Sequence, residues 1–190
     1  LQDNGKEARI KWKETASSNV DVIKSWNAKW RDANWGAVTG AASGFIALDV
    51  DGEAGKNSLA TLVHSHGDLP KTLISKTGKG FHYLFRAPKS PLPNRTGMEP
   101  GLDIRADGGY IVIPPSIHPN GHRYQWVDAN TEVAELPMWL ESKIREKSRK
   151  VELTKATVRF TTDPAGEQGL SKRVISSGTR NSRLHAEAGK

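Results

Sequence analysis

The sequence predicts an α+β domain in which strands occupy the middle of the chain and helices lie toward its ends. Two patterns carry this prediction. Short runs of alternating apolar and polar residues fill positions 37–127, and apolar residues recur at helical spacing near positions 22–30 and 137–147. With 190 residues, the chain can form one domain with a substantial core. We expect a mixed β-sheet carrying the functional residues in a cleft, with helices packed around it.

The first expected helix begins at residues 18–21, which offer a capping side chain and an acid for the first turn. Val22, Ile23, Trp26 and Trp30 then follow at helical spacing, so both tryptophans are expected in the core. Strands are expected at 37–40 and 45–51, and a second helix at 57–66 ends at a glycine.

A hairpin is expected next, because two alternating runs flank a loop rich in Gly and Lys at 77–80. Its strands would be 72–76 and 81–85. The prolines of residues 88–100 predict a stiff loop. The remaining expected elements are strands at 102–105, 109–113 and 122–127 and a helix at 137–147.

The chain has no cysteine, which excludes disulfides, cysteine-bound zinc and thiol catalysis. No apolar run is long enough to span a membrane and no signal peptide pattern is present, so we expect a cytoplasmic protein without a membrane partner. Residues 1–147 would form the core, 148–175 a basic polar linker, and 176–190 the start of a truncated helical domain.

Positive charge is concentrated at the C-terminal end. Residues 143–190 contain 12 Lys and Arg against 5 Asp and Glu, whereas residues 1–142 contain 16 of each. This asymmetry favours a polyanionic partner such as nucleic acid, although a solvated helix followed by a linker explains it equally well. Lys172, Arg173 and Arg180 are the candidate contacts, and Arg180 could instead cap a helix.

Two carboxylates close the apolar strand at 45–51. Alternation places Asp49 and Asp51 on one face, with α-carbons about 6–7 Å apart, so both side chains could reach the same divalent cation. An Asp-Gly pair after a strand is also an ordinary turn. The pair alone leaves both interpretations open.

Further motifs follow in order: Gly78-Lys79-Gly80-Phe81-His82, then Gly101-Leu102-Asp103-Ile104-Arg105, then Gly108–His118 and Gly121–Trp126. Together with Gly44–Asp51, these motifs resemble the primase-polymerase (Prim-Pol) catalytic domain of the archaeo-eukaryotic primase superfamily, as found in plasmid and phage replication proteins. The resemblance covers roughly residues 36–127. Residues 177–184 resemble the start of the helical domain that often follows such cores.

The resemblance implies that Asp49, Asp51 and Asp103 hold two Mg²⁺ or Mn²⁺ ions, for which carboxylate oxygens are suitable ligands. It also implies that His82 contacts the triphosphate of the incoming nucleotide. A zinc element of the kind found in cellular primases is excluded without cysteine. The further candidate nucleotide contacts are Lys79, Arg105, Ser116 and His118.

Each assignment has a structural alternative. His82 and Asp103 could be ordinary strand residues, Arg105 could pair with Asp103 or Asp107, and Ser116 and His118 could only shape their loop. A leading helix and strand usual in the family are not found before Lys11-Trp12-Lys13, so we expect either a trimmed N-terminus or the loss of the first strand. No Walker A pattern is present, so a helicase module would lie outside this chain.

The sequence therefore predicts a nucleotidyltransferase, a DNA primase or DNA polymerase or both, that acts on a DNA template and primer with nucleoside triphosphates. Its setting would be the replication of a plasmid, phage or other mobile element. Two alternatives stay open: a metal-dependent nuclease or replication-initiator endonuclease, and a non-catalytic DNA-binding module.

Overall fold

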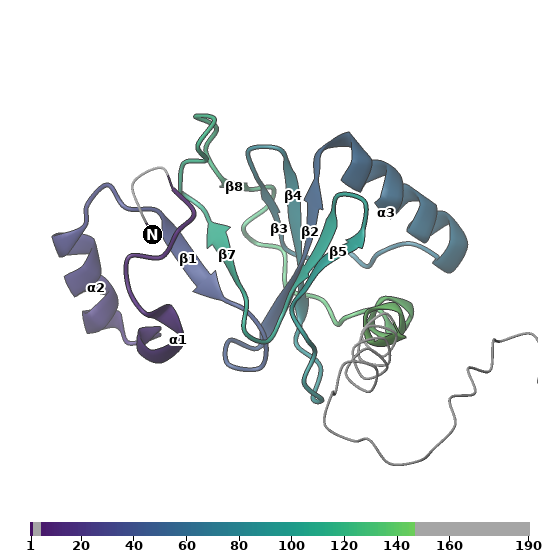
Figure 1. The fold of residues 1–190 in the computed structure, drawn as a ribbon, viewed down its shortest axis with the longest axis horizontal. Helices are drawn as coiled ribbons and strands as arrows, with labels where there is room; N and C mark the ends of the chain where they lie inside the picture. Colours follow the sequence, from purple (N-terminus) through teal and green to yellow (C-terminus); the bar gives the residue numbers. More distant parts are fainter. Residues whose placement is uncertain (2–4, 147–190) are drawn as a thin grey trace, which may run out of the picture. The chain divides into compact units, whose positions relative to one another are not determined.

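A six-stranded sheet forms the centre of the computed structural model, which describes Leu1 and residues 5–146 (Figure 1). The strand order is β5-β6-β2-β4-β3-β8, and every pairing between these strands is antiparallel. In chain order the strands are β2 (Phe45–Asp51), β3 (Ile74–Lys76), β4 (Gly80–Arg86), β5 (Arg95–Glu99), β6 (Leu102–Arg105) and β8 (Gln125–Trp126).

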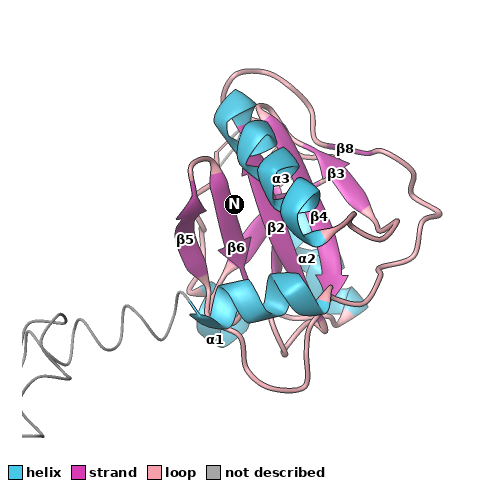
Figure 2. Ribbon diagram, turned by 90° about the vertical axis from the view of Figure 1, so that its right-hand side faces the viewer, coloured by secondary structure: helices cyan, strands magenta, loops and turns pink. Residues whose placement is uncertain are grey.

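A second, two-stranded sheet lies on one face of the first. It pairs β1 (Trp35–Val38) with β7 (Tyr110–Ile113) in antiparallel register. The helices α1 (Trp12–Thr15) and α2 (Val20–Lys29) lie on its outer side, as Figure 1 shows. The opposite face of the large sheet is covered by α3 (Gly52–His66), which crosses β2 and β4 in Figure 2, and by a helix over residues 138–146.

The two faces of β2 have different neighbours. Ile46, Leu48 and Val50 are fully buried and pack with Leu59 of α3 and Ile144 of the last helix. On the other face, Ala47 packs with Leu84 of β4 and Ile111 of β7, beneath the small sheet. Alternation along the strand therefore places Asp49 and Asp51 on the small-sheet side.

Glycines allow the close approach of β2, α3 and β6. Gly52 has φ of +62° where the chain turns from β2 into α3. A Cβ on Gly55 would lie 2.4 Å from the carbonyl oxygen of Gly101, so only glycine lets the first turn of α3 rest on the start of β6. This contact fixes the end of β2 relative to β6.

The α+β class is confirmed, with several differences from the sequence prediction. Parallel pairing is confined to isolated bridges such as Phe85↔Ala134, so the sheet is antiparallel where a mixed one was expected. The region 88–100, expected as a loop, contains β5, in which only Met98 is buried. The second helix begins at Gly52, five residues earlier than expected, because Gly52 turns the chain directly into it.

Trp26 and Trp30 are also not core residues, because both are only partly buried, Trp26 within α2 and Trp30 at its C-cap. The predicted linker at 148–175 and the predicted helical segment at 176–190 lie outside the described residues. Within the described part of the chain, no helix is long and apolar enough to cross a membrane.

Candidate active site

Three neighbouring strands bring the predicted acidic residues and histidine into one row. Asp49 of β2 is paired in register with His82 of β4 on one side and with Asp103 of β6 on the other. Directly paired residues project to the same face, so all three side chains lie on the small-sheet side. Asp51 follows two residues after Asp49, at the exposed end of the same strand.

Ion pairs connect the members of this row. The Nη2 atom of Arg105 lies 2.7 Å from Oδ2 of Asp103 and 3.5 Å from Oδ2 of Asp49, while Nε2 of His82 lies 3.4 Å from Oδ1 of Asp49. The second oxygen of Asp103, Oδ1, accepts a hydrogen bond of 2.6 Å from the backbone N–H of Gly97 on β5. The sheet and Arg105 together hold both carboxylates in place.

Asp49 is the most enclosed of the three carboxylates, with 15% of its side chain exposed. Burial raises its pKa, but the hydrogen bond and charge of His82, followed by the charges of Arg105 and Lys6, outweigh burial and bring the pKa below its usual value. The carboxylate is therefore ionised at neutral pH and available as an acceptor for a cation.

The loop between β3 and β4 is folded around Thr77. Its hydroxyl accepts hydrogen bonds from the backbone N–H groups of Lys79, at 3.2 Å, and Gly80, at 2.9 Å. The carbonyl of Lys79 accepts from the N–H of Gly52, which ties the loop to the start of α3. The exposed Lys79 thus stands next to the end of β2 that carries Asp51.

A second wall comes from residues 116–124. The Nδ2 group of Asn120 donates to the carbonyl of Gly78 at 2.9 Å, and a Cβ on Gly78 would lie 2.3 Å from the ring of His118. His118 therefore rests directly on the Gly/Lys loop. Burial lowers the pKa of His118. Its neighbour Ser116 accepts a hydrogen bond of 2.8 Å from the N–H of Trp35 and donates to the carbonyl of the same residue at 3.3 Å.

Tyr124 was not singled out from the sequence as a site residue, yet it lies between the two histidines. Its ring centre is 6.1 Å from that of His82 and 6.0 Å from that of His118. Burial, together with the charges of Asp49 and Asp51, raises the pKa of Tyr124 to about 12. Its sequence signals were its position in an expected strand and within the motif Gly121–Trp126. Lys6, whose charge acts on both Asp49 and His118, gave no signal at all.

The structure thus brings together most of the residues proposed from the sequence. Asp49, Asp103, His82 and Arg105 form the contacts described above, and Asp51 lies on the same face of β2. Lys79 and His118 flank this face from two adjoining loops, whereas the hydroxyl of Ser116 is bonded to the backbone of β1. Lys172, Arg173 and Arg180 lie outside the described residues.

The donor set suits a hard divalent cation, because Asp49, Asp51 and Asp103 offer carboxylate oxygens from one face of adjacent strands. Within the described residues, no three such side chains are already gathered around one point. The guanidinium of Arg105 instead supplies the positive charge between Asp49 and Asp103.

Comparison with known proteins identifies the family. Residues 1–139 match the family model described as the N-terminal domain of bifunctional DNA primase/polymerase, Prim-Pol. No curated protein matches the chain. The matched segment includes every strand of both sheets and the whole acidic row. The chain therefore belongs to the Prim-Pol family of bifunctional DNA primase/polymerase N-terminal domains.

Proposed function

We propose that this chain transfers nucleotides from nucleoside triphosphates to a growing strand under the direction of a DNA template, as a primase, a polymerase or both. Membership of the Prim-Pol family supports a primase/polymerase-type role in DNA replication. The observation that carries the finer proposal is the row of Asp103, Asp49 and His82 across three adjacent strands, with Asp51 beside it.

In this proposal, Asp49, Asp51 and Asp103 hold two divalent ions, Mg²⁺ or Mn²⁺. When bound, the ions lower the charge on the attacking hydroxyl and on the leaving pyrophosphate. Asp49 is well suited to this role because its pKa lies below the usual value, so no proton competes for its oxygens near neutral pH. Asp51 makes no capping bond to α3, so its carboxylate is not used by the helix.

The basic side chains around the carboxylates would bind the triphosphate. His82, whose Nε2 lies 3.4 Å from Oδ1 of Asp49, would contact a phosphate bound beside the ions. Lys79 adds a point charge from its exposed loop, and His118 adds a ring nitrogen from the facing loop. Arg105 would move part of its contact from Asp103 to a phosphate, because guanidinium groups bind either partner with the same geometry.

The broader setting of the reaction is proposed from the resemblance to known replication proteins. Prim-Pol domains of the kind that this chain resembles occur in plasmid and phage replication proteins, so we propose the replication of a mobile element. A helicase module or protein would then act with this chain. Primer extension on a circular template, with and without such a helicase, would test the association.

The test is primer extension with Mg²⁺ or Mn²⁺, labelled nucleotides and a primed template. Asp51→Asn removes one charge at an exposed position, so the fold should be retained while extension falls about 100-fold or more. Asp68→Asn is the matched control, since it makes the same change at an exposed aspartate after α3. Its extension should equal that of the parent chain.

The same assay separates the alternatives. Strand cleavage without extension would favour a metal-dependent nuclease, and DNA binding without either reaction would favour a non-catalytic module. Equal extension by the parent and by Asp51→Asn would contradict the proposed metal ligands. Omitting the primer tests initiation separately from extension.

A further inference from the structure

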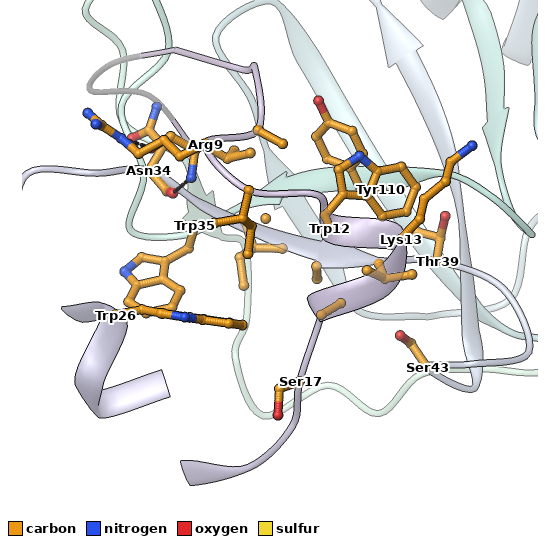
Figure 3. Close-up of a pocket in the computed structure, with 18 of the residues that line it drawn as sticks. Arg9, Trp12, Lys13, Ser17, Trp26, Asn34, Trp35, Thr39, Ser43 and Tyr110 are labelled. Carbon is orange, nitrogen blue, oxygen red and sulfur yellow. Dashed lines mark hydrogen bonds between the residues drawn. The ribbon is translucent and has the colours of Figure 1, made fainter. Parts of the chain in front are cut away.

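An aromatic cavity lies on the outer side of the small sheet, away from the row of carboxylates. It encloses about 870 Å³ between α1, α2 and the strands β1 and β7. Figure 3 shows Trp12 and Tyr110 on one side and Trp26 on the other, with Lys13 extending beside Trp12. Trp30 and Trp35 also line it. We call this site the tryptophan cavity.

The helix α2, which forms one wall of this cavity, contributes no buried residue to the core. Trp26 within the helix and Trp30 at its C-cap are only partly buried. Large aromatic side chains usually account for much of the apolar area that a domain buries. A helix that instead directs two of them toward an open cavity is suited to a ligand with flat, apolar faces.

Positive charge accompanies the aromatic rings. The ammonium group of Lys13 lies 5.6 Å from the ring centre of Trp12, and that of Lys29 lies 4.8 Å from the ring centre of Trp30. Among the described residues that line the cavity, one is acidic, Asp107. Its two oxygens already accept the backbone N–H groups of Ala41 and Leu92. The ligand that complements this surface is therefore anionic as well as flat.

Lys6 of the N-terminal segment interacts both with the tryptophan cavity and with the row of carboxylates. Tyr110, which lines the cavity, donates its hydroxyl proton to the carbonyl of Lys6 at 2.7 Å. The side-chain charge of Lys6 acts on Asp49 and on His118. Lys6 therefore contacts a residue of the tryptophan cavity through its backbone and adds positive charge near the carboxylates through its side chain.

We propose that the tryptophan cavity binds unpaired bases of single-stranded template DNA, with Lys13 and Lys29 neutralising the adjacent phosphates. This proposal rests on the proposed function, because it takes DNA as the template. Bases stack on aromatic side chains irrespective of sequence, and lysines bind the backbone, so the combination suits a template of any sequence. A purely apolar protein partner would leave both ammonium groups against an apolar surface, which is unfavourable.

Binding is measured on the whole chain without metal or nucleotides, so that the result does not depend on catalysis. A fluorescein-labelled oligothymidylate is titrated by anisotropy at several salt concentrations. Trp26→Ala should weaken binding about 5- to 100-fold, the range expected for the loss of one base stack. Trp26→Phe keeps an aromatic face and should retain most of the affinity.

The lysines provide a second measurement that does not involve the tryptophans. Lys29→Ala should reduce the slope of log K against log salt by about 0.7, the value for one phosphate contact on a single strand. Lys24→Ala is the matched control, because Lys24 is exposed on the same helix but, among the described residues, only Lys29 of the two has its ammonium over a tryptophan that lines the cavity. Circular dichroism checks that the variants fold, which is expected because α2 has no buried residue.

Each outcome decides the proposal. Unchanged affinity and salt dependence in both Trp26→Ala and Lys29→Ala would overturn it. Self-association of the parent chain that Trp26→Ala abolishes would also overturn it, because a second copy would then fill the cavity. Binding that depends on Trp26 in a chain that extends no primer would keep the cavity assignment and reject the proposed function. Binding that does not depend on Trp26, in a chain that extends primers, would keep the proposed function and reject the cavity assignment.

Discussion

Gly80 of β4 is paired with Asp51 at the end of β2. A Cβ added there would lie 1.8 Å from the carbonyl oxygen of Val50, a backbone atom that cannot turn away. Non-bonded carbon and oxygen atoms approach to about 3.3 Å. Gly80→Ala therefore forces β2 and β4 apart by roughly 1.5 Å at the edge that carries the acidic residues.

The energetic cost can be worked from the contacts that would be lost. The N–H of Gly80 donates to Thr77 Oγ1 at 2.9 Å, and its carbonyl accepts from the N–H of Thr77 at 2.9 Å. Two hydrogen bonds at about 1 kcal/mol each, together with about 1–3 kcal/mol for overpacking, predict a loss of about 3–5 kcal/mol. Primer extension should fall as well, because Lys79 and His82 flank the displaced residue.

Urea unfolding of the parent and of Gly80→Ala measures the loss. Gly36→Ala is the matched control, since a Cβ on this β1 residue would meet only the side chain of Leu1, at 3.4 Å. Its free energy of unfolding should change by less than about 0.5 kcal/mol. If Gly80→Ala were as stable as Gly36→Ala and extended primers normally, the close contact of β2 and β4 would be refuted.

Three further predictions concern residues around the row. Ser75→Ala should raise the free energy of unfolding by about 1 kcal/mol, because Ser75 Oγ is buried and has no hydrogen-bond partner among the described residues. A lower free energy of unfolding in urea would show instead that Ser75 pairs with His82 Nδ1, which also lacks a partner in that part of the chain. Arg105→Met should destabilise the chain by about 1–2 kcal/mol, because Asp49 and Asp103 then lack the guanidinium group that contacts both of them. Mn²⁺ should raise the melting temperature of this variant more than that of the parent. Tyr124→Phe should lose less stability in alkali than the parent. The pKa of Tyr124 is about 12 in the folded chain against 10.0 for a free tyrosine, so the phenol makes stability fall as the pH rises from 10 to 12. Thermal melts across that range would contradict this if the stability of both chains declined alike.

Local periodicity in the sequence was sufficient to predict the elements whose two faces have different neighbours. The strand over Phe45–Asp51 alternates between core and small-sheet neighbours, so the sequence placed Asp49 and Asp51 on one face correctly. The same principle failed for β5, where only Met98 is buried and Gly97 and Glu99 carry no strand signal. An edge strand with one buried side chain has almost no pattern to detect.

The candidate site required information that spacing cannot provide. Asp103 follows Asp49 by more than fifty residues, and only the register of β6 on β2 makes the two direct neighbours. Arg105 was left between two roles, and its 2.7 Å contact with Asp103 shows that the ion pair exists. Trp26 was expected in the core because helical spacing identifies an apolar face but not what covers that face.

The acidic row lies on the same face of the large sheet as the contact with the small sheet. Along this face of β2 and β4, the paired residues Ala47 and Leu84 lie beneath Ile111 and are apolar. One pair further, the same face carries Asp49 and His82, and these polar groups are tolerated because they contact each other and Arg105 provides a countercharge. A single pair of strands therefore anchors the domain with one half of its length and presents charged groups with the other. The rigidity of the buried half is what allows carboxylates on separate strands to be held at fixed spacing, which binding a small, highly charged cation requires.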